Sequence, residues 1–173
     1  MSSETAPRRL VLARHAQAVD AAATDAVREL SARGRRDAEA AGRWLAELGV
    51  TPDHALVSAA VRTSQTWDQM CAGAGWELAA DLDRGLYEAG TDAALDLVRL
   101  VPAQVRTLVV VGHNPTIGSL AHVLDDGDGD PEAVTALLGG YPTSALTVFA
   151  VSAAWADLAE ESATVLAHHV ARG

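Results

Sequence analysis

The sequence of 173 residues predicts an α/β fold, a three-layer sandwich in which helices cover both faces of a mainly parallel central sheet. Two runs, residues 9–13 (RLVLA) and 107–111 (TLVVV), are almost entirely apolar, as expected of parallel strands buried on both faces. Helical patterns alternate with these runs along the chain. Because the length suits one core, we expect a single domain over residues 8–173, preceded by a flexible N-terminus of residues 1–7.

The first helix is predicted to begin at Ser31, a residue type that caps helix N-termini, and to end near residue 48, before Gly49. The last two strands are joined by a loop that contains Trp155, and one of them is expected at the edge of the sheet. The other expected elements are a strand at 54–58, a helix at 60–72, a helix from a Thr91 cap to about 101, a helix to about 124 with Asn114 as cap and Pro115 as first residue, a helix from about Pro131, and strands at 144–151 and 164–170.

The composition excludes several classes of function. The net charge is −10, which argues against a general nucleic-acid or anionic-membrane binder. All 13 basic residues are Arg, so no Lys is present to form a Schiff base or to serve a P-loop. The single cysteine, Cys71, excludes an internal disulfide and a zinc finger, and its helical position predicts a small core residue.

Nothing in the sequence indicates export or membrane insertion. Residues 1–7 are polar and lack the apolar region of a secretory signal. The longest purely aliphatic stretch, residues 108–111, is far too short to cross a bilayer. We therefore expect a cytoplasmic protein with no membrane partner, and the single thiol fits a reducing compartment.

An acidic segment at residues 125–130 (DDGDGD) resembles a calcium loop only superficially. Aligned with the EF-hand loop from Asp126, position six is Pro131 where Gly is required, and position twelve is Leu137 where Glu is required. We expect a solvated loop there.

Charged and imidazole side chains follow the predicted strands. Arg14 and His15 come directly after the strand at 9–13, and His113 follows Gly112 after the strand at 107–111. The carboxyl ends of parallel strands form the ligand-binding edge of an open α/β sheet. Arg62 lies on the first turn of the helix after the strand at 54–58, with a guanidinium fork that matches phosphate oxygens. Each of these residues alone also fits a surface position, but together they predict a site for a tetrahedral dianion with a neutral nitrogen nucleophile.

The other four histidines are expected to be structural or exposed. His168 and His169 are adjacent on a strand, so their side chains point to opposite faces and cannot bind one metal together. His54 opens a strand and His122 lies on a helix. A zinc site at His15 and His113 lacks an obvious third ligand, so we expect no metal and no cofactor.

Three blocks resemble the signature motifs of the histidine phosphatase (phosphoglycerate mutase-like) superfamily. They are residues 12–16 (LARHA), the Ser58-x-x-x-Arg62-Thr63-x-x-Thr66 segment and residues 111–115 (VGHNP). The short length and the Leu30-Ser31-x-x-Gly34 segment are most similar to its small SixA-type phosphohistidine phosphatases. The resemblance runs from about residue 9 to the last strand, and it implies a phosphoglycerate mutase-like fold.

The resemblance also implies a mechanism. By that analogy His15 is the nucleophile that forms a phosphohistidine intermediate, while Arg14, Arg62 and His113 hold the phosphoryl oxygens. Water then releases phosphate without a metal. Gln17 and Asn114 are predicted from their positions to line the phosphate pocket.

The sequence departs from the usual superfamily pattern at one position and leaves another open. Ala16 stands where Gly is usual after the Arg-His pair. For a general acid, residues 86–89 (LYEA) offer Glu88, with Asp81, Asp83 and Asp92 nearby. If Glu88 points into the pocket, phosphomonoesters become plausible substrates. If it lies out of reach, phosphohistidine is favoured, because an imidazole leaves with its own proton whereas an alkoxide needs one delivered.

The sequence thus predicts a metal-independent histidine phosphatase that acts on protein phosphohistidine through an intermediate on His15. Two alternatives stay open: a small-molecule phosphomonoester phosphatase of the same superfamily, and a non-catalytic module that binds a phospho-ligand. The expected partner is a phosphorylated protein or a small phosphorylated substrate, with no nucleic acid. We expect a monomer.

Overall fold

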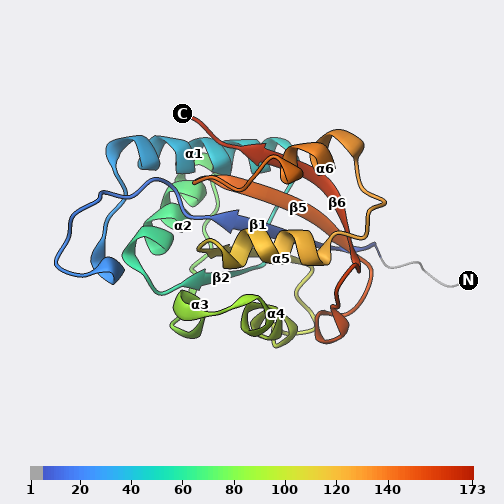
Figure 1. The fold of residues 1–173 in the computed structure, drawn as a ribbon. Helices are drawn as coiled ribbons and strands as arrows, with labels where there is room; N and C mark the ends of the chain where they lie inside the picture. Colours follow the sequence, from blue (N-terminus) through green and yellow to red (C-terminus); the bar gives the residue numbers. More distant parts are fainter. Residues whose placement is uncertain (1–5) are drawn as a thin grey trace, which may run out of the picture.

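The structure is a computed structural model that describes residues 6–173 (Figure 1). Ala6 and Pro7 lead directly into the first strand. The flexible segment predicted for residues 1–7 therefore lies mostly outside the described residues.

A six-stranded sheet in the order β3-β2-β4-β1-β5-β6 forms the centre of the molecule. Strands β1 to β4 run parallel to one another, while β5 is antiparallel to both β1 and β6. This confirms a mainly parallel sheet, with β6 at one edge as predicted for one of the last two strands. The strands are β1 (Arg8–Arg14), β2 (His54–Ser58), β3 (Asp81–Asp83), β4 (Thr107–Gly112), β5 (Ala145–Val151) and β6 (Ala163–Val170).

Helices cover both faces of this sheet, so the predicted three-layer sandwich is confirmed (Figure 1). Successive residues of β1 face opposite layers. Val11 and Ala13 pack in one apolar cluster with residues of α1 and α2, while Leu10 and Leu12 pack in the other with residues of α4 and α5. The helices are α1 (Ala32–Glu47), α2 (Val61–Ala74), α3 (Gly85–Glu88), α4 (Thr91–Arg99), α5 (Thr116–Leu124) and α6 (Pro131–Leu138), with short 3-10 turns at Asp25–Val27 and Trp155–Asp157.

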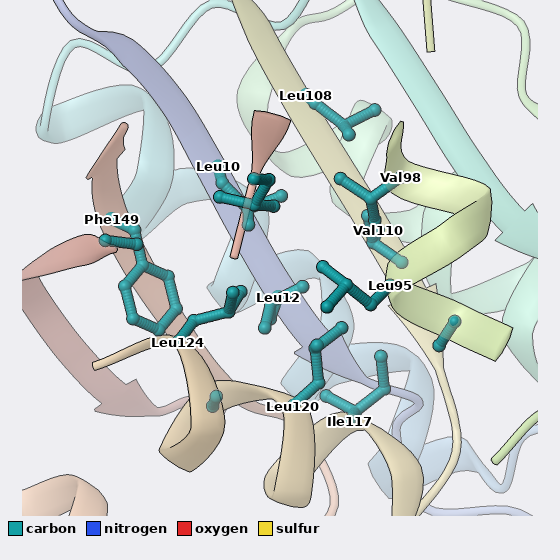
Figure 2. Packing of buried hydrophobic residues seen from close by; sticks show 14 of the residues in the cluster. Leu10, Leu12, Leu95, Val98, Leu108, Val110, Ile117, Leu120, Leu124 and Phe149 are labelled. Carbon is teal, nitrogen blue, oxygen red and sulfur yellow. The ribbon is translucent and has the colours of Figure 1, made fainter. Parts of the chain in front are cut away.

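Leucine and valine side chains fill the layer between the sheet and helices α4 and α5 (Figure 2). Leu12 of β1 and Val110 of β4 are fully buried, and they face Leu95 of α4 and Leu120 of α5. This packing fixes α5, the helix that follows His113, against the carboxyl ends of β1 and β4.

On the opposite face, α1 and α2 approach each other until their backbones touch. A Cβ atom at Gly42 of α1 would lie 2.0 Å from the Met70 carbonyl oxygen, and one at Gly73 of α2 would lie 2.0 Å from the Glu39 carbonyl oxygen. Only glycine permits this contact at either position. The close contact holds α2, which carries Arg62, firmly on the sheet.

Two predicted helix starts are confirmed and two are wrong. Ser31 caps α1 through a hydrogen bond from the Gly34 amide, and Asp130 caps α6 ahead of Pro131. Thr91 is the first residue of α4, and Gly90 precedes it as the cap. Pro115 is the cap of α5 and not its first residue.

The sequence did not predict β3, α3 or the 3-10 turn at Asp25–Val27. Strand β3 has three residues, and its central Leu82 is exposed, so it carries no apolar run. Helix α3 has four residues, too few for a periodic pattern.

Cys71 is half-buried against the apolar cluster of α1 and α2. Burial raises the pKa of its thiol to about 11, which keeps it protonated, as suits the predicted core role. Within residues 6–173 no helix is both long and apolar enough to cross a membrane. Over the same residues no three His, Cys, Asp or Glu side chains gather closely enough to hold a metal ion.

Candidate active site

The four residues predicted to form the site meet at the carboxyl ends of β1, β2 and β4. Arg14 ends β1 opposite Gly112 of β4, and the His15 amide donates to the Gly112 carbonyl at 3.0 Å. His113 follows Gly112, and the centroids of the His15 and His113 rings lie 5.4 Å apart. Arg62, on the first turn of α2, is buried beside them. Figure 1 shows that the connection after β1 and helix α3 lie at this same end of the sheet.

The His15 ring has a defined orientation. Its side chain is buried, with 8% of its surface exposed, and its Nδ1 lies 2.7 Å from the Ala16 carbonyl oxygen. A carbonyl only accepts hydrogen bonds, so Nδ1 carries the proton and Nε2 carries the lone pair. The Ala16 amide in turn donates to Thr66 Oγ1 at 3.0 Å, and that hydroxyl donates to the Arg62 carbonyl. Thr66 of α2 therefore holds the peptide that orients the His15 ring.

Ala16 fits without strain where the superfamily usually has Gly. Its side chain is fully buried and packs with Leu30 and Ala38, and its backbone does not adopt a positive φ. The methyl group thus becomes part of a small apolar cluster behind His15.

His113 is held from two sides. Its Nε2 lies 2.7 Å from Ser58 Oγ, at the end of β2, and the Tyr87 ring of α3 meets its ring edge-on at a centroid distance of 5.4 Å. Its Nδ1 is buried and has no hydrogen-bond partner among the described residues. When Ser58 donates to Nε2, the proton of a neutral His113 resides on Nδ1, which is then a free donor.

Hydrogen bonds from the terminal nitrogens hold the guanidinium groups of Arg14 and Arg62. Arg14 Nη1 donates to the Tyr141 carbonyl at 3.1 Å. Arg62 donates from Nη1 to the Asp25 carbonyl at 2.9 Å and from Nη2 to the Asp25 carboxylate at 3.0 Å. The Nε atoms of both arginines are buried without a partner among the described residues. Unsatisfied buried donors are costly, so this cluster favours an anion that satisfies them.

The electrostatics keep both histidines neutral. Burial is the main reason that the pKa of His15 falls to about 3, and His113, Arg62 and Arg14 lower it further. Burial and Arg62 likewise lower the pKa of His113 to about 4. The two guanidinium groups thus favour the neutral form of His15, and at neutral pH the Nε2 lone pair is available.

Asp25 and Tyr87 also belong to the site, although neither was predicted from the sequence. The Asp25 carboxylate accepts hydrogen bonds from Tyr87 Oη at 2.5 Å, Arg28 Nη1 at 3.0 Å and Arg62. These donors hold the pKa of Asp25 well below its usual range, and the same contact raises the pKa of Tyr87. The only sequence signal for Asp25 is its place in the long connection after β1, which must lie at the ligand-binding edge.

Glu88, the predicted general acid, is exposed at the end of α3. Successive residues of a helix point about 100° apart, and Tyr87 is the one that faces His113 and Asp25. No hydrogen bond or ion pair joins the Glu88 carboxylate to another residue in 6–173. Glu88 instead lines an adjacent hollow of about 310 Å³, together with Ala26, Ala59, Ala60, Arg84 and Tyr87.

The side chains of Gln17 and Asn114, which were predicted to line the phosphate pocket, form hydrogen bonds with other parts of the fold. Gln17 is exposed, and its side-chain oxygen accepts from Ser31 Oγ at 2.9 Å, beside the cap of α1. The Asn114 amide donates to the Tyr141 carbonyl at 2.7 Å and accepts from the Gly118 amide at 3.2 Å. Neither side chain hydrogen-bonds to His15, Arg62 or His113. A Cβ atom at Gly112 would lie 2.9 Å from the Ile117 side chain, so this glycine makes room for α5.

The remaining histidines lie outside the site. His168 and His169 do face opposite sides of β6, as predicted: His168 Nδ1 lies 2.9 Å from Thr147 Oγ1, and His169 stacks on Trp44 of α1. His54 Nε2 lies 3.5 Å from an Asp81 carboxylate oxygen, and His122 is exposed.

A neutral histidine with a free Nε2, flanked by two guanidinium groups and a second histidine at the ligand-binding edge of this sheet, defines a phosphatase site of the phosphoglycerate mutase-like class. Comparison with known proteins agrees: residues 10–97 match the family described as histidine phosphatase superfamily (branch 1). The chain belongs to this superfamily, and both the fold and the family predicted from the sequence are confirmed.

Individual relatives refine the likeness. An uncharacterized protein of Mycobacterium tuberculosis (strain H37Rv) is 36% identical over 84% of this chain and 90% of its own length. A solved structure of a proposed phosphohistidine phosphatase SixA from Nakamurella multipartitia has a TM-score of 0.84 at 33% identity, covering 96% of this chain and 98% of that one. A second proposed SixA structure, from Agrobacterium tumefaciens, has a TM-score of 0.73 at 30% identity, covering 85% and 94%. The chain is therefore SixA-like within the superfamily.

The buried neutral histidines predict an acid-sensitive fold. Because the folded-state pKa of His15 lies below its unfolded value of 6.5, its contribution to stability is fully present above pH 6.5 and is lost as pH falls toward about 3. By linkage, His15 alone should lower the free energy of unfolding by about 2 kcal/mol between pH 7.5 and pH 5. Urea unfolding of the parent and of His15→Gln at both pH values measures this. An equal pH dependence in parent and variant would contradict the buried neutral state of His15.

The Thr66 contact predicts a defined His15 tautomer. Thr66→Val keeps the side-chain shape but removes the hydroxyl that accepts from the Ala16 amide, at a cost of about 1 kcal/mol in stability. We expect ¹⁵N NMR to show a single Nδ1–H tautomer of His15 in the parent and a mixture in the variant. Thr135→Val removes a comparable hydroxyl on exposed helix α6, bonded to the Pro131 carbonyl, and should leave the His15 signals unchanged. A single, unaltered tautomer in Thr66→Val would show that Thr66 does not orient the ring.

Proposed function

We propose that the protein is a phosphohistidine phosphatase that transfers the phosphoryl group of a protein phosphohistidine to His15 Nε2 and then releases it to water. The observation that carries this proposal is the His15 ring itself. It is buried and neutral, its Nδ1 is committed to the Ala16 carbonyl, and two arginines and His113 surround it with donors that lack partners.

In the first step, the lone pair of Nε2 attacks phosphorus in line with the leaving group. The Nδ1–H bond to the Ala16 carbonyl is kept, and the ring becomes cationic as the N–P bond forms. A charged donor strengthens a hydrogen bond, so this contact stabilises the phosphorylated form of His15.

Arg14, Arg62 and His113 stabilise the negative charge that spreads over the phosphoryl oxygens during transfer. Two guanidinium groups and an N–H donor act here without reorganisation, because Tyr141, Asp25 and Ser58 already hold them in place. No step requires a metal or a cofactor.

In the second step, a water molecule attacks phosphorus from the side that the leaving group has vacated. The P–Nε2 bond breaks, its electron pair returns to Nε2, and the water supplies oxygen and proton to the released phosphate. His15 regains its starting tautomer.

The carboxylates near the site favour phosphohistidine over a phosphomonoester. A serine or sugar alkoxide must be protonated as it leaves, whereas an imidazole protonated on its far nitrogen leaves as a neutral ring. Asp25 is held ionised by three donors and is a poor acid. Glu88 contacts none of the four central residues. The SixA-type neighbours carry the same proposed activity in their names.

The alternative of a small phosphomonoester substrate is favoured by one observation: Glu88 lines the hollow beside Tyr87, from which it can act on a leaving group seated there. In the preferred account, the partner is a phosphorylated protein. The enzyme acts as a monomer in the cytoplasm, in keeping with its net negative charge and its single protonated thiol.

A single-turnover assay tests the proposal with two substrates, a phosphohistidine-bearing protein and p-nitrophenyl phosphate, in the presence of EDTA. We expect the parent to hydrolyse phosphohistidine faster, His15→Ala to be inactive, and Arg62→Ala to be slower by about 10²- to 10³-fold. Glu88→Gln should leave phosphohistidine turnover unchanged.

Three results would contradict the proposal. Turnover of p-nitrophenyl phosphate alone would favour the phosphomonoester alternative. Phosphate binding by both parent and His15→Ala, with no turnover of either substrate by the parent, would identify a non-catalytic binding module. Loss of activity in EDTA would show that a metal takes part.

A further inference from the structure

Asp25 carries an exposed carboxylate that accepts a hydrogen bond from Arg62, one of the residues proposed to hold the phosphoryl group. It comes from the 3-10 turn Asp25–Val27 in the connection between β1 and α1, and half of its side chain (52%) is exposed. Its Oδ2 accepts from Arg62 and Tyr87, whereas Oδ1 accepts, among residues 6–173, only from Arg28. A carboxylate oxygen has two acceptor positions, so Oδ1 retains one that no donor of the described residues occupies.

The direction of phosphoryl transfer places the leaving group on the solvent side. His15 is buried, and in an in-line transfer the leaving atom lies opposite the attacking nitrogen. The leaving group must therefore extend from the phosphoryl site toward the exposed rim, where Asp25 and the ring of Tyr87 lie beside Arg62.

The hollow of about 310 Å³ beside Tyr87 gives this rim its shape. Ala26, which follows Asp25, and Ala59 and Ala60, which lie three and two residues before Arg62, supply its small apolar walls, and Arg84, Tyr87 and Glu88 complete the lining. The hollow thus lies next to Asp25, because Ala26 is the neighbour of Asp25 in the chain and Tyr87 donates to its carboxylate. It is large enough for a flat ring and part of a peptide backbone.

Building on the proposed phosphohistidine activity, we infer that Asp25 is the residue that selects the leaving group, by accepting the N–H of the departing imidazole. The hollow beside Tyr87 holds that ring. A carboxylate at this place attracts a leaving group that carries a nitrogen-bound proton and repels one that becomes an oxyanion.

The chemical step needs no proton from Asp25. The substrate ring enters with a proton on the nitrogen remote from phosphorus. As His15 Nε2 bonds to phosphorus, the bond between phosphorus and the substrate nitrogen breaks and its electron pair stays on that nitrogen. The ring leaves neutral, still hydrogen-bonded to the Asp25 carboxylate through its remote N–H.

Asp25→Asn tests this role, because it keeps the size and an acceptor oxygen but removes the charge. The readout is the ratio of kcat/KM for a phosphohistidine peptide to that for p-nitrophenyl phosphate. Both values can fall, since Asp25 also holds Arg62. We expect the phosphohistidine value to fall about 10- to 100-fold more than the p-nitrophenyl phosphate value, the range for a hydrogen bond to a charged group, because only the imidazole loses that bond. Asp20→Asn, an exposed position of the same connection, makes the same change in net charge and should alter neither value.

A role confined to holding Arg62 would slow both substrates equally in Asp25→Asn, and that outcome would overturn the inference. Tyr87→Phe adds a second check, since it removes only one of the donors to Asp25 and should shift the ratio in the same direction to a lesser degree. If the parent shows no phosphohistidine turnover at all, the proposed function fails first. Turnover by the parent with an unchanged ratio in Asp25→Asn refutes the role of Asp25 alone.

Discussion

A neutral imidazole buried between two guanidinium groups is the constraint around which the site is arranged. His15 is buried at the carboxyl edge of the sheet, where little water screens the positive charges of Arg14 and Arg62. Protonation of the His15 ring is therefore disfavoured both by burial and by these two guanidinium groups. The same field that keeps His15 unprotonated favours an anion. In the proposed function, one arrangement thus provides both the nucleophile and the affinity for a phosphoryl dianion, with Asp25 as the counter-charge on the exposed side of Arg62.

The fold holds His15, the proposed nucleophile, mainly through the backbone. The His15 amide bonds to β4, the His15 carbonyl accepts from the Ser144 amide ahead of β5, and the next amide bonds to Thr66 of α2. Three elements distant in sequence therefore fix a segment of two residues. Tyr141 adds a further link, because its carbonyl accepts from both Arg14 and Asn114 while its hydroxyl donates to the Leu12 carbonyl. Hydrogen bonds from several packed elements thus hold the site, and Asp25 lies on its exposed side.

Much of this architecture could be predicted from the sequence, and the reasons for success and failure are physical. The buried strands β1 and β4 carry strong apolar runs, so the residues that follow them, His15 and His113, could be placed at one edge. The rim could not be predicted, since β3, α3 and the 3-10 turn at Asp25 are too short for a periodic signal. Glu88 was predicted as the general acid because it is acidic, whereas on α3 it is the side chain of Tyr87 that points toward His113. Which side chain of a short helix faces the site cannot be predicted when the start of that helix is not known.

The most direct test of the account is the position of the phosphoryl group on the trapped intermediate. The protein, uniformly labelled with ¹⁵N in histidine, would be mixed with a phosphohistidine protein, quenched rapidly in alkali and examined by ³¹P–¹⁵N correlation NMR. The orientation of the ring, with Nδ1–H on the Ala16 carbonyl, predicts a bond from phosphorus to Nε2 of His15. A bond to Nδ1, a phosphorylated His113, or no phosphorylated protein during active turnover would contradict it.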